Sequence, residues 1–317
     1  MSTSPAFSRG SAIGILLLLG LVFASNHIAA RFAFDHGTGL VTAVLVRSGV
    51  TALILFFVAL WMRAPLRLSA YRVPKLWVGV LAALIALQSL LLYSAVARIP
   101  VALALLVFNL FPALFTLLNW LLGGPRASLR TAALIALIII GLALALDLPG
   151  QLAKPGAGSV QFWAGVSFGF GAASVFALAL RVTEFKLKAL VGPVRSLWTM
   201  GLVTLMLSAL SLSVLAGAAG ESAGDWLMRS LHWPQNMTGW LGLAGLTLCY
   251  GSAFSVFFAL MPKLDMARNA PASNIEPVAA LILGWSLLGQ SMSAMQLLGA
   301  ATVVIGIVLL ALGGVKK

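Results

Sequence analysis

Residues 274–289 read NIEPVAALILGWSLLG, a stretch in which Glu276 stands directly before Pro277 and an apolar run follows. A carboxylate inside a bilayer is costly, so it usually faces a water-filled cavity or a partner group. Proline has no backbone N–H and kinks or breaks a helix, which frees carbonyl oxygens in the preceding turn. The stretch therefore predicts either a functional site in a membrane-spanning helix or a structural ion pair near its end, and the sequence leaves both open.

An earlier copy of this stretch lies at residues 109–128, shifted by 165 residues. The copies align without a gap, and seven of twenty positions are identical, more than a shared apolar composition gives by chance. The same shift carries Gly141 onto Gly306. The identical pairs are Asn109/Asn274, Pro112/Pro277, Leu118/Leu283, Trp120/Trp285, Leu122/Leu287, Gly124/Gly289 and Ser128/Ser293.

The composition is that of a membrane protein, because 61% of the 317 residues are hydrophobic and only 9% are charged. A soluble chain of this length needs a more polar surface, whereas helices that span a bilayer need apolar runs of about twenty residues. We therefore predict an all-α polytopic membrane protein. Its ten apolar segments lie at residues 12–30, 40–61, 75–95, 100–122, 130–147, 161–182, 193–216, 238–260, 270–288 and 294–313.

The net charge of +13 at pH 7 is explained by basic loops rather than by a nucleic-acid site. With the N-terminus inside, fifteen of the twenty Lys and Arg residues lie in cytoplasmic segments, four lie in outer loops, and Arg47 lies within a helix. Short loops rich in Lys and Arg stay in the cytoplasm. We expect the inner (plasma) membrane as the location, with both termini cytoplasmic.

The repeat divides the segments into two sets of five. Because five is an odd number, the second set enters the membrane from the opposite side. Two inverted repeats around a site near the midplane are a common plan of alternating-access carriers. We predict ten transmembrane helices in one membrane domain, 1–317, with a first repeat at 1–150, a second, inverted repeat at 151–317 and a central cavity. Some channels share this plan.

The order of Pro277, an apolar run with a tryptophan, Leu-Leu-Gly at 287–289 and a further apolar run with glycine resembles the EamA-type family of the drug/metabolite transporter superfamily. The resemblance implies ten helices, cytoplasmic termini and export of small metabolites, often amino acids. In its polar Asn26 and its aromatic-rich helices the chain resembles exporters of aromatic amino acids. The family usually has Glu after Leu-Leu-Gly, and this chain departs from it with Pro125 and Gln290.

Glu276 is the leading candidate for a substrate-binding residue. It is expected to bind a substrate ammonium group or to exchange a proton, unless it forms an ion pair with Arg268 or Arg195. Ser273 is three residues away and shares its helical face, and Asn274 is the repeated asparagine of the stretch.

Asn109 and Pro112 repeat this geometry without the charge. Asn109 is expected either to offer its amide to a substrate or to bond across helices. Pro112 and Pro277 are expected to act as hinges. Arg47 and Arg195 occupy matched positions, and each is expected either to meet a substrate carboxylate, to form a gate pair or to extend to the nearest interface.

Other residues within the spans are candidates for the pathway. Trp163 is expected to anchor its helix at the interface or to stack on an aromatic substrate. His27 and Arg31 share a helical face at a spacing of four, and we expect them at the outer end of their helix rather than in a proton relay. The preferred lining residues are Asn26, Gln88, Tyr93 and Tyr250.

The sequence carries no phosphate loop, metal-ligand spacing or catalytic triad, and Cys249 is its one cysteine. We expect that the protein is not an enzyme and that it binds no metal and no cofactor. We expect its transport to be driven by gradients rather than by ATP. The expected function is secondary active export of small metabolites, amino acids first, by alternating access. Carriers of drugs, sugars or nucleotide-linked metabolites and a channel are the alternatives. The expected partners are a small-molecule substrate and the lipid bilayer, with proton coupling and a homodimer left open.

Overall fold

The computed structural model describes residues 7–71, 73–123, 128–147, 157–216, 225, 228–260, 264 and 275–313. These ranges are largely helical and contain no strand. Seven helical segments are long and apolar enough to cross a membrane, with α4 and α5 counted as one, and three shorter apolar helices accompany them. The prediction of an all-helical membrane protein is thereby confirmed for the described part of the chain.

The helices follow the apolar segments of the sequence. The helix predicted to end at residue 30 continues to Asp35, because Arg31 pairs with Asp35 at 2.9 Å along the same face. The bounds are α1 Arg9–Asp35, α2 Leu40–Trp61, η1 Leu68–Tyr71, α3 Lys75–Val96, α4 Val101–Phe108, α5 Phe111–Leu121, α6 Leu129–Ala145, α8 Ala157–Lys186, α9 Gly192–Leu215, α11 Met237–Leu260, α13 Glu276–Leu288 and α14 Ala294–Gly313.

The helix predicted over residues 100–122 is broken into α4 and α5. Pro112 cannot donate an N–H to the Phe108 carbonyl, so the regular ladder stops there. Asn109 caps the end of α4, because its backbone N–H and its side-chain Nδ2 each donate to the Leu105 carbonyl at 2.8 Å. Pro112 therefore lies at an interruption of the helix, the position that its predicted hinge role requires.

The two copies of the repeated stretch begin their helices at the same register. α5 begins at Phe111 and α13 begins at Glu276, which are equivalent positions one residue before each proline. The preceding residues have almost the same backbone, with φ −68° and ψ −13° at Leu110 and φ −68° and ψ −19° at Ile275. A repeated sequence thus gives a repeated local structure.

The helices pack in pairs that correspond between the two halves. α1 packs along α11 and α3 along α8, while α2 packs against α9 and α6 against α14. A Cβ added to Gly141 would lie 2.9 Å from Thr302 Cβ, and one added to Gly306 would lie 2.6 Å from Ile138 Cγ1. The contacts run in reverse order, so α6 and α14 are antiparallel and in close contact through their glycines.

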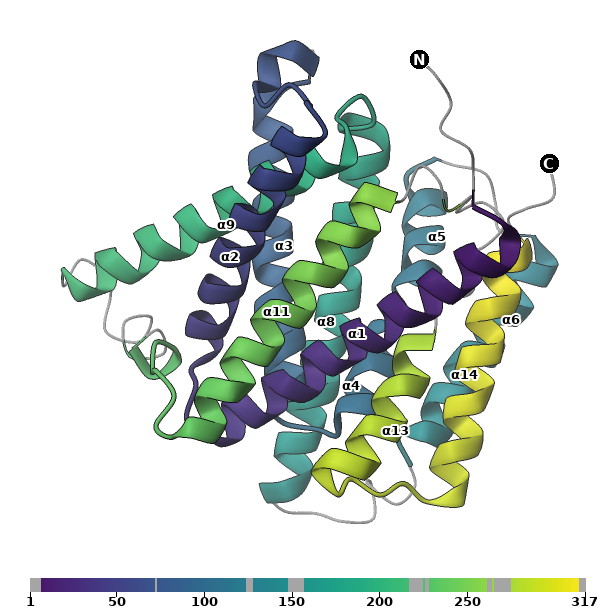
Figure 1. Ribbon diagram of the computed structural model, residues 1–317. Coiled ribbons are helices and arrows are strands. Elements are labelled where there is room, and N and C mark those ends of the chain that lie inside the picture. The colour runs from purple at the N-terminus through teal and green to yellow at the C-terminus, as the bar shows by residue number, and fades with distance from the viewer. Residues whose placement is uncertain are drawn as a thin grey trace.

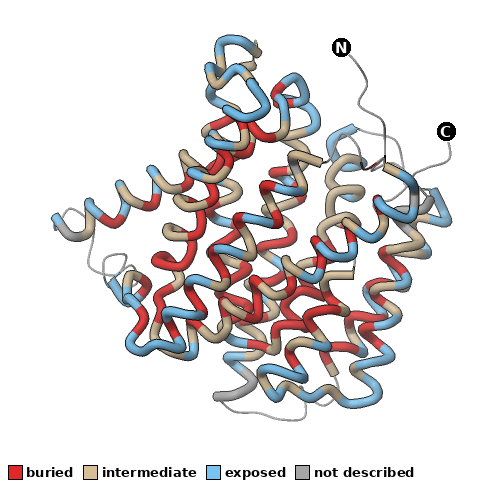
Figure 2. Tube along the Cα trace, in the orientation of Figure 1, coloured by how far each residue is buried: buried red, intermediate tan, exposed pale blue. Residues whose placement is uncertain are grey.

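We call the two ends of the bundle the terminal end and the distal end. At the terminal end α1 begins and α14 ends, and at the distal end α1 ends and α4 and α11 begin (Figure 1). α4 lies near the centre, and residues 101–107 along it are all buried (Figure 2). The side chains of α4 therefore form part of the central core, and its last residue reaches the cavity described next.

Candidate functional site

A partly open cavity of about 560 Å³ lies between helices of both halves. Side chains from α1, α2, α3, α4, α5, α8, α9, α11 and α13 line it. Its volume is within the range of about 300–1,000 Å³ that is usual for small-molecule sites. Most of its wall is apolar, and the aromatic members are Phe23, Phe108, Phe111, Phe176, Tyr250, Phe254 and Phe257.

The cavity is displaced toward the terminal end. α8 contributes residues near its end, such as Thr183, whereas α9 contributes residues near its start, such as Thr199. The distal end is closely packed, since a Cβ added to Gly242 would lie 2.6 Å from the Ala33 nitrogen and one added to Gly165 would lie 2.6 Å from Ile99 Cγ2. The cavity therefore lies nearer to the terminal end than to the closely packed distal end.

Arg47 supplies a buried positive charge to the cavity wall. Its Nη1 donates to the Tyr93 hydroxyl at 3.0 Å and its Nη2 donates to Ser89 Oγ at 2.8 Å. Its guanidinium carbon lies 4.0 Å from the centre of the Tyr250 ring and 4.9 Å from that of Tyr93. Tyr93 in turn donates to Asn26 Oδ1 at 3.0 Å, so residues of α3 and α1 fix this arginine of α2.

Glu276 supplies the negative charge. Its Oε1 lies 3.3 Å from His27 Nε2, and both residues line the cavity. Glu276 is the first residue of α13, where a carboxylate interacts favourably with the helix dipole. Glu276, Arg47 and Arg195 all line this cavity, and the Tyr250 ring lies against the Arg47 guanidinium.

Several buried polar atoms beside this cluster have no hydrogen-bond partner in the described residues. They are Asn26 Nδ2, His27 Nδ1 and Arg47 Nε. Native structures leave few such groups unsatisfied, and those that remain call for an explanation such as a ligand or water. The cluster therefore has hydrogen-bonding capacity that the protein does not use itself.

The structure brings many of the predicted site residues to this cavity and places others elsewhere. Asn26 and Tyr93, expected on the wall, are fully buried behind Arg47 and act on it rather than on the cavity directly. Trp163 does not line the cavity and packs edge-on against Phe162. Ser273 and Asn274 lie outside the described residues. The residues on the wall are Arg47, Gln88, Asn109, Arg195, Tyr250 and Glu276.

His27 was expected at the outer end of its helix, and this expectation is wrong. Because α1 continues to Asp35, His27 lies inside the bundle and is 6% exposed. His27 lies beside Glu276, for which Arg195 or Arg268 was the predicted partner, and Arg268 lies outside the described residues. The four-residue spacing of His27 and Arg31 showed that they share a helical face. It did not show how far His27 lies from the end of the helix, because that depends on where the helix ends.

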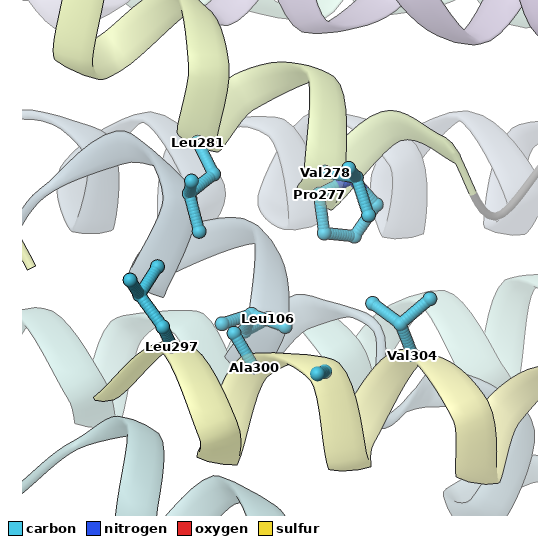
Figure 3. A pocket seen from close by; sticks show the side chains of 8 residues that line it. Leu106, Pro277, Val278, Leu281, Leu297, Ala300 and Val304 are labelled. Carbon is cyan, nitrogen blue, oxygen red and sulfur yellow. The ribbon is translucent and has the colours of Figure 1, made fainter. Parts of the chain in front are cut away.

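Pro277 borders a second, smaller cavity. This gap has a volume of about 140 Å³ and lies between α4, α13 and α14. Figure 3 shows the apolar side chains that meet there, among them Leu106, Val278 and Val304. α13 is therefore loosely packed toward α14, next to the proline that was predicted to be a hinge.

Gln290, which replaces the Glu of the family pattern, has a defined contact. Its Oε1 accepts a hydrogen bond from the backbone N–H of Val101 at 3.1 Å. Val101 is the first residue of α4, whose N–H groups lack partners within the helix. Gln290 thus caps the start of α4 from the other half of the chain, while Pro125 lies outside the described residues.

No group of three or more His, Cys, Asp or Glu residues that would suit a metal ion occurs in the described ranges. The wall of the cavity combines an apolar aromatic surface with the hydrogen-bonded Arg47, a second arginine, Arg195, and the contact of Glu276 with His27. Such a wall suits an amphiphilic small molecule more than a bare ion.

Comparison with known proteins identifies the family. The sequence model of the EamA-like transporter family matches residues 10–146 and, separately, 163–312. A protein of Sinorhizobium sp., described as an uncharacterized transporter in the cobO 3′ region, is 31% identical over 156 residues, which are 48% of this chain and 96% of that protein. A protein of known crystal structure has a similar fold, with a TM-score of 0.60 and 21% sequence identity. The match covers 98% of this chain and 100% of that protein, and at this identity it shows the fold alone.

Proposed function

The chain belongs to the EamA-like transporter family of the drug/metabolite transporter superfamily, and from this premise we propose that it exports amino acids or similar small zwitterions. The observation that carries the proposal is the pair of opposite charges on one aromatic-lined wall. Arg47 suits a carboxylate and Glu276 suits an ammonium group, and the Tyr250 ring lies against Arg47 on the same cavity wall. The rings of the remaining wall suit an apolar side chain.

The proposed architecture is ten transmembrane helices in two inverted five-helix repeats, residues 1–150 and 151–317, within one membrane domain. The antiparallel pairing of α6 with α14 supports it, as do the corresponding helix pairs and the two matches to the family. α1 begins and α14 ends at one end of the bundle, and with the basic loops this favours cytoplasmic termini in the inner membrane (Figure 1).

The proposed mechanism is alternating access. The cavity lies toward the terminal end, which is the cytoplasmic end under this topology, and the distal end is closely packed. Rocking of α3, α4 and α5 against α11 and α13, near Pro112 and Pro277, would exchange the open and closed ends. Crosslinks that hold both ends should abolish flux, and undiminished flux through the locked protein would refute the mechanism.

Reconstitution tests the function. Purified protein in liposomes should show saturable counterflow of at least one member of a panel of labelled amino acids. The panel is measured at two pH values to detect proton coupling. Saturation with counter-exchange excludes a channel. Counterflow of sugars, drugs or nucleotide-linked compounds, with none of any amino acid, would reject the proposed substrate class while leaving the transporter family intact.

A further inference from the structure

Arg47 is a buried cation without a carboxylate partner among the residues that the structure describes. It is 3% exposed, whereas the described carboxylates of Glu276, Asp35 and Asp225 lie against His27, Arg31 and Arg229. The sequence left open that Arg47 extends to the membrane interface, but its side chain stays in the bundle and faces the cavity. A buried charge without a counter-ion is strongly unfavourable, so an anion entering the cavity would gain from neutralising it.

The guanidinium is held in place before any ligand arrives. Tyr93 and Ser89 accept from Nη1 and Nη2, and Tyr250 lies against its face. These contacts leave Nε, which has no partner in the described part of the chain, together with the remaining N–H groups of Nη1 and Nη2. A fixed guanidinium with free donors matches the two oxygens of a carboxylate.

Glu276 is in the opposite situation. His27 lies 3.3 Å from its Oε1, and the start of α13 provides further favourable electrostatics. A substrate ammonium group would therefore replace or share an existing interaction instead of satisfying an unpaired charge. The gain from a carboxylate at Arg47 should exceed the gain from an ammonium group at Glu276.

We propose that Arg47 makes a carboxylate the required group of the substrate and leaves the ammonium group dispensable. The ligand class is then apolar monocarboxylates, aromatic or aliphatic, with or without an α-amino group. Their apolar bodies would pack on the aromatic wall, for example on Phe111 and Phe176, whose ring centres are 4.9 Å apart. This inference rests on the proposed function and narrows its substrate class.

Four phenyl compounds separate the two charges. They are L-phenylalanine, 3-phenylpropionate, 2-phenylethylamine and 3-phenylpropan-1-ol, tested as competitors of labelled L-phenylalanine counterflow and in direct binding to the purified protein. We expect 3-phenylpropionate to bind within about tenfold of L-phenylalanine, and the amine and the alcohol to bind at least about tenfold more weakly, because a charged hydrogen-bonded pair commonly changes affinity by that factor. An amine that binds as well as phenylalanine, with a propionate that does not bind, would overturn the inference while amino-acid transport stands.

Variants test the residue itself. Arg47→Gln should weaken both carboxylates at least about tenfold, and Arg47→Lys should restore part of this loss because it keeps the charge without the planar fork. Arg98→Gln is the matched control, because Arg98 stacks on Phe168 and does not line the cavity. If Arg47→Gln does not fold, the four-compound series on the unchanged protein decides the question.

The outcomes distinguish the two proposals. Binding of 3-phenylpropionate that depends on Arg47, with no counterflow of any amino acid, would support the anion site and reject amino-acid export. Carboxylate binding that is unchanged in Arg47→Gln, or no carboxylate binding by the folded protein, would reject the anion site.

Discussion

Removal of the Tyr93 hydroxyl tests whether the arginine cluster is held as the structure indicates. This hydroxyl accepts from Arg47 at 3.0 Å and donates to Asn26 at 3.0 Å, and both partners are buried. Hydrogen bonds between membrane helices contribute about 0.6 kcal/mol on average and up to about 1.7 kcal/mol. Two such bonds, one of them to a charge, predict that Tyr93→Phe lowers the free energy of unfolding by about 1–3 kcal/mol.

The matched control is Tyr250→Phe. Tyr250 also contacts the Arg47 guanidinium, but its hydroxyl has no hydrogen-bond partner in the described residues. The ring contact survives both changes, so the comparison isolates the hydroxyl. Denaturant titration in mixed micelles compares the stability of the two variants. Because Tyr250 itself lines the cavity, 3-phenylpropionate binding is compared between Tyr93→Phe and the unchanged protein and measures whether Arg47 is still in place. Equal stability in the two variants, with unchanged affinity in Tyr93→Phe, would show that the Tyr93 bonds do not position the arginine.

Three further changes test other contacts. Glu276→Gln should reduce amino-acid counterflow in liposomes by no more than about tenfold, the loss expected where the substrate ammonium group adds affinity without being required. Unchanged kinetics would remove Glu276 from the mechanism. Gly242→Ala places a Cβ 2.6 Å from the Ala33 nitrogen and should destabilise the closed distal end by about 1–3 kcal/mol. Gly201→Ala, whose added Cβ meets no atom within 4 Å, should not change the stability. Denaturant titration and thiol labelling of single cysteines at the distal end measure the effect, and equal behaviour of the two variants would contradict the close packing. Gln290→Ala should lower the free energy of unfolding by about 0.5–1.5 kcal/mol in the same titration. Gln290→Glu should keep the stability of the unchanged protein, because it places an acceptor and a negative charge at the start of α4. A loss of stability in both variants would argue against capping.

The sequence predicted much of this fold because the periodic features were strong. Apolar runs located the helices, and the repeated Asn-x-x-Pro stretch located the break before Pro112 and the equivalent start of α13. It also selected Glu276 and Arg47, since charges within apolar runs are conspicuous. These inferences need only local composition and spacing.

The partners of those charges could not be found in the same way. α1 is apolar over most of its circumference, so its sequence does not show which residues lie deep and which lie at an end. The charge of Arg31 suggested an early end, but Asp35 and the Val96 carbonyl satisfy that charge and the helix continues. Contacts such as Glu276 with His27 join residues far apart in the chain, and one sequence contains no record of such pairs.

The polar contacts of the cavity are divided unequally between the repeats, and this division has a consequence for movement. Arg47 lies on α2, both of its hydrogen-bond partners lie on α3, and Tyr93 is held in turn by Asn26 of α1, so all these residues belong to the first repeat. Glu276 belongs to the second repeat and meets the first through His27. A shift of α13 into the apolar gap beside Pro277 would therefore disturb the His27–Glu276 pair and leave the hydrogen bonds of Arg47 intact. A bound carboxylate would then stay with the first repeat, while the contact at Glu276 changes between states.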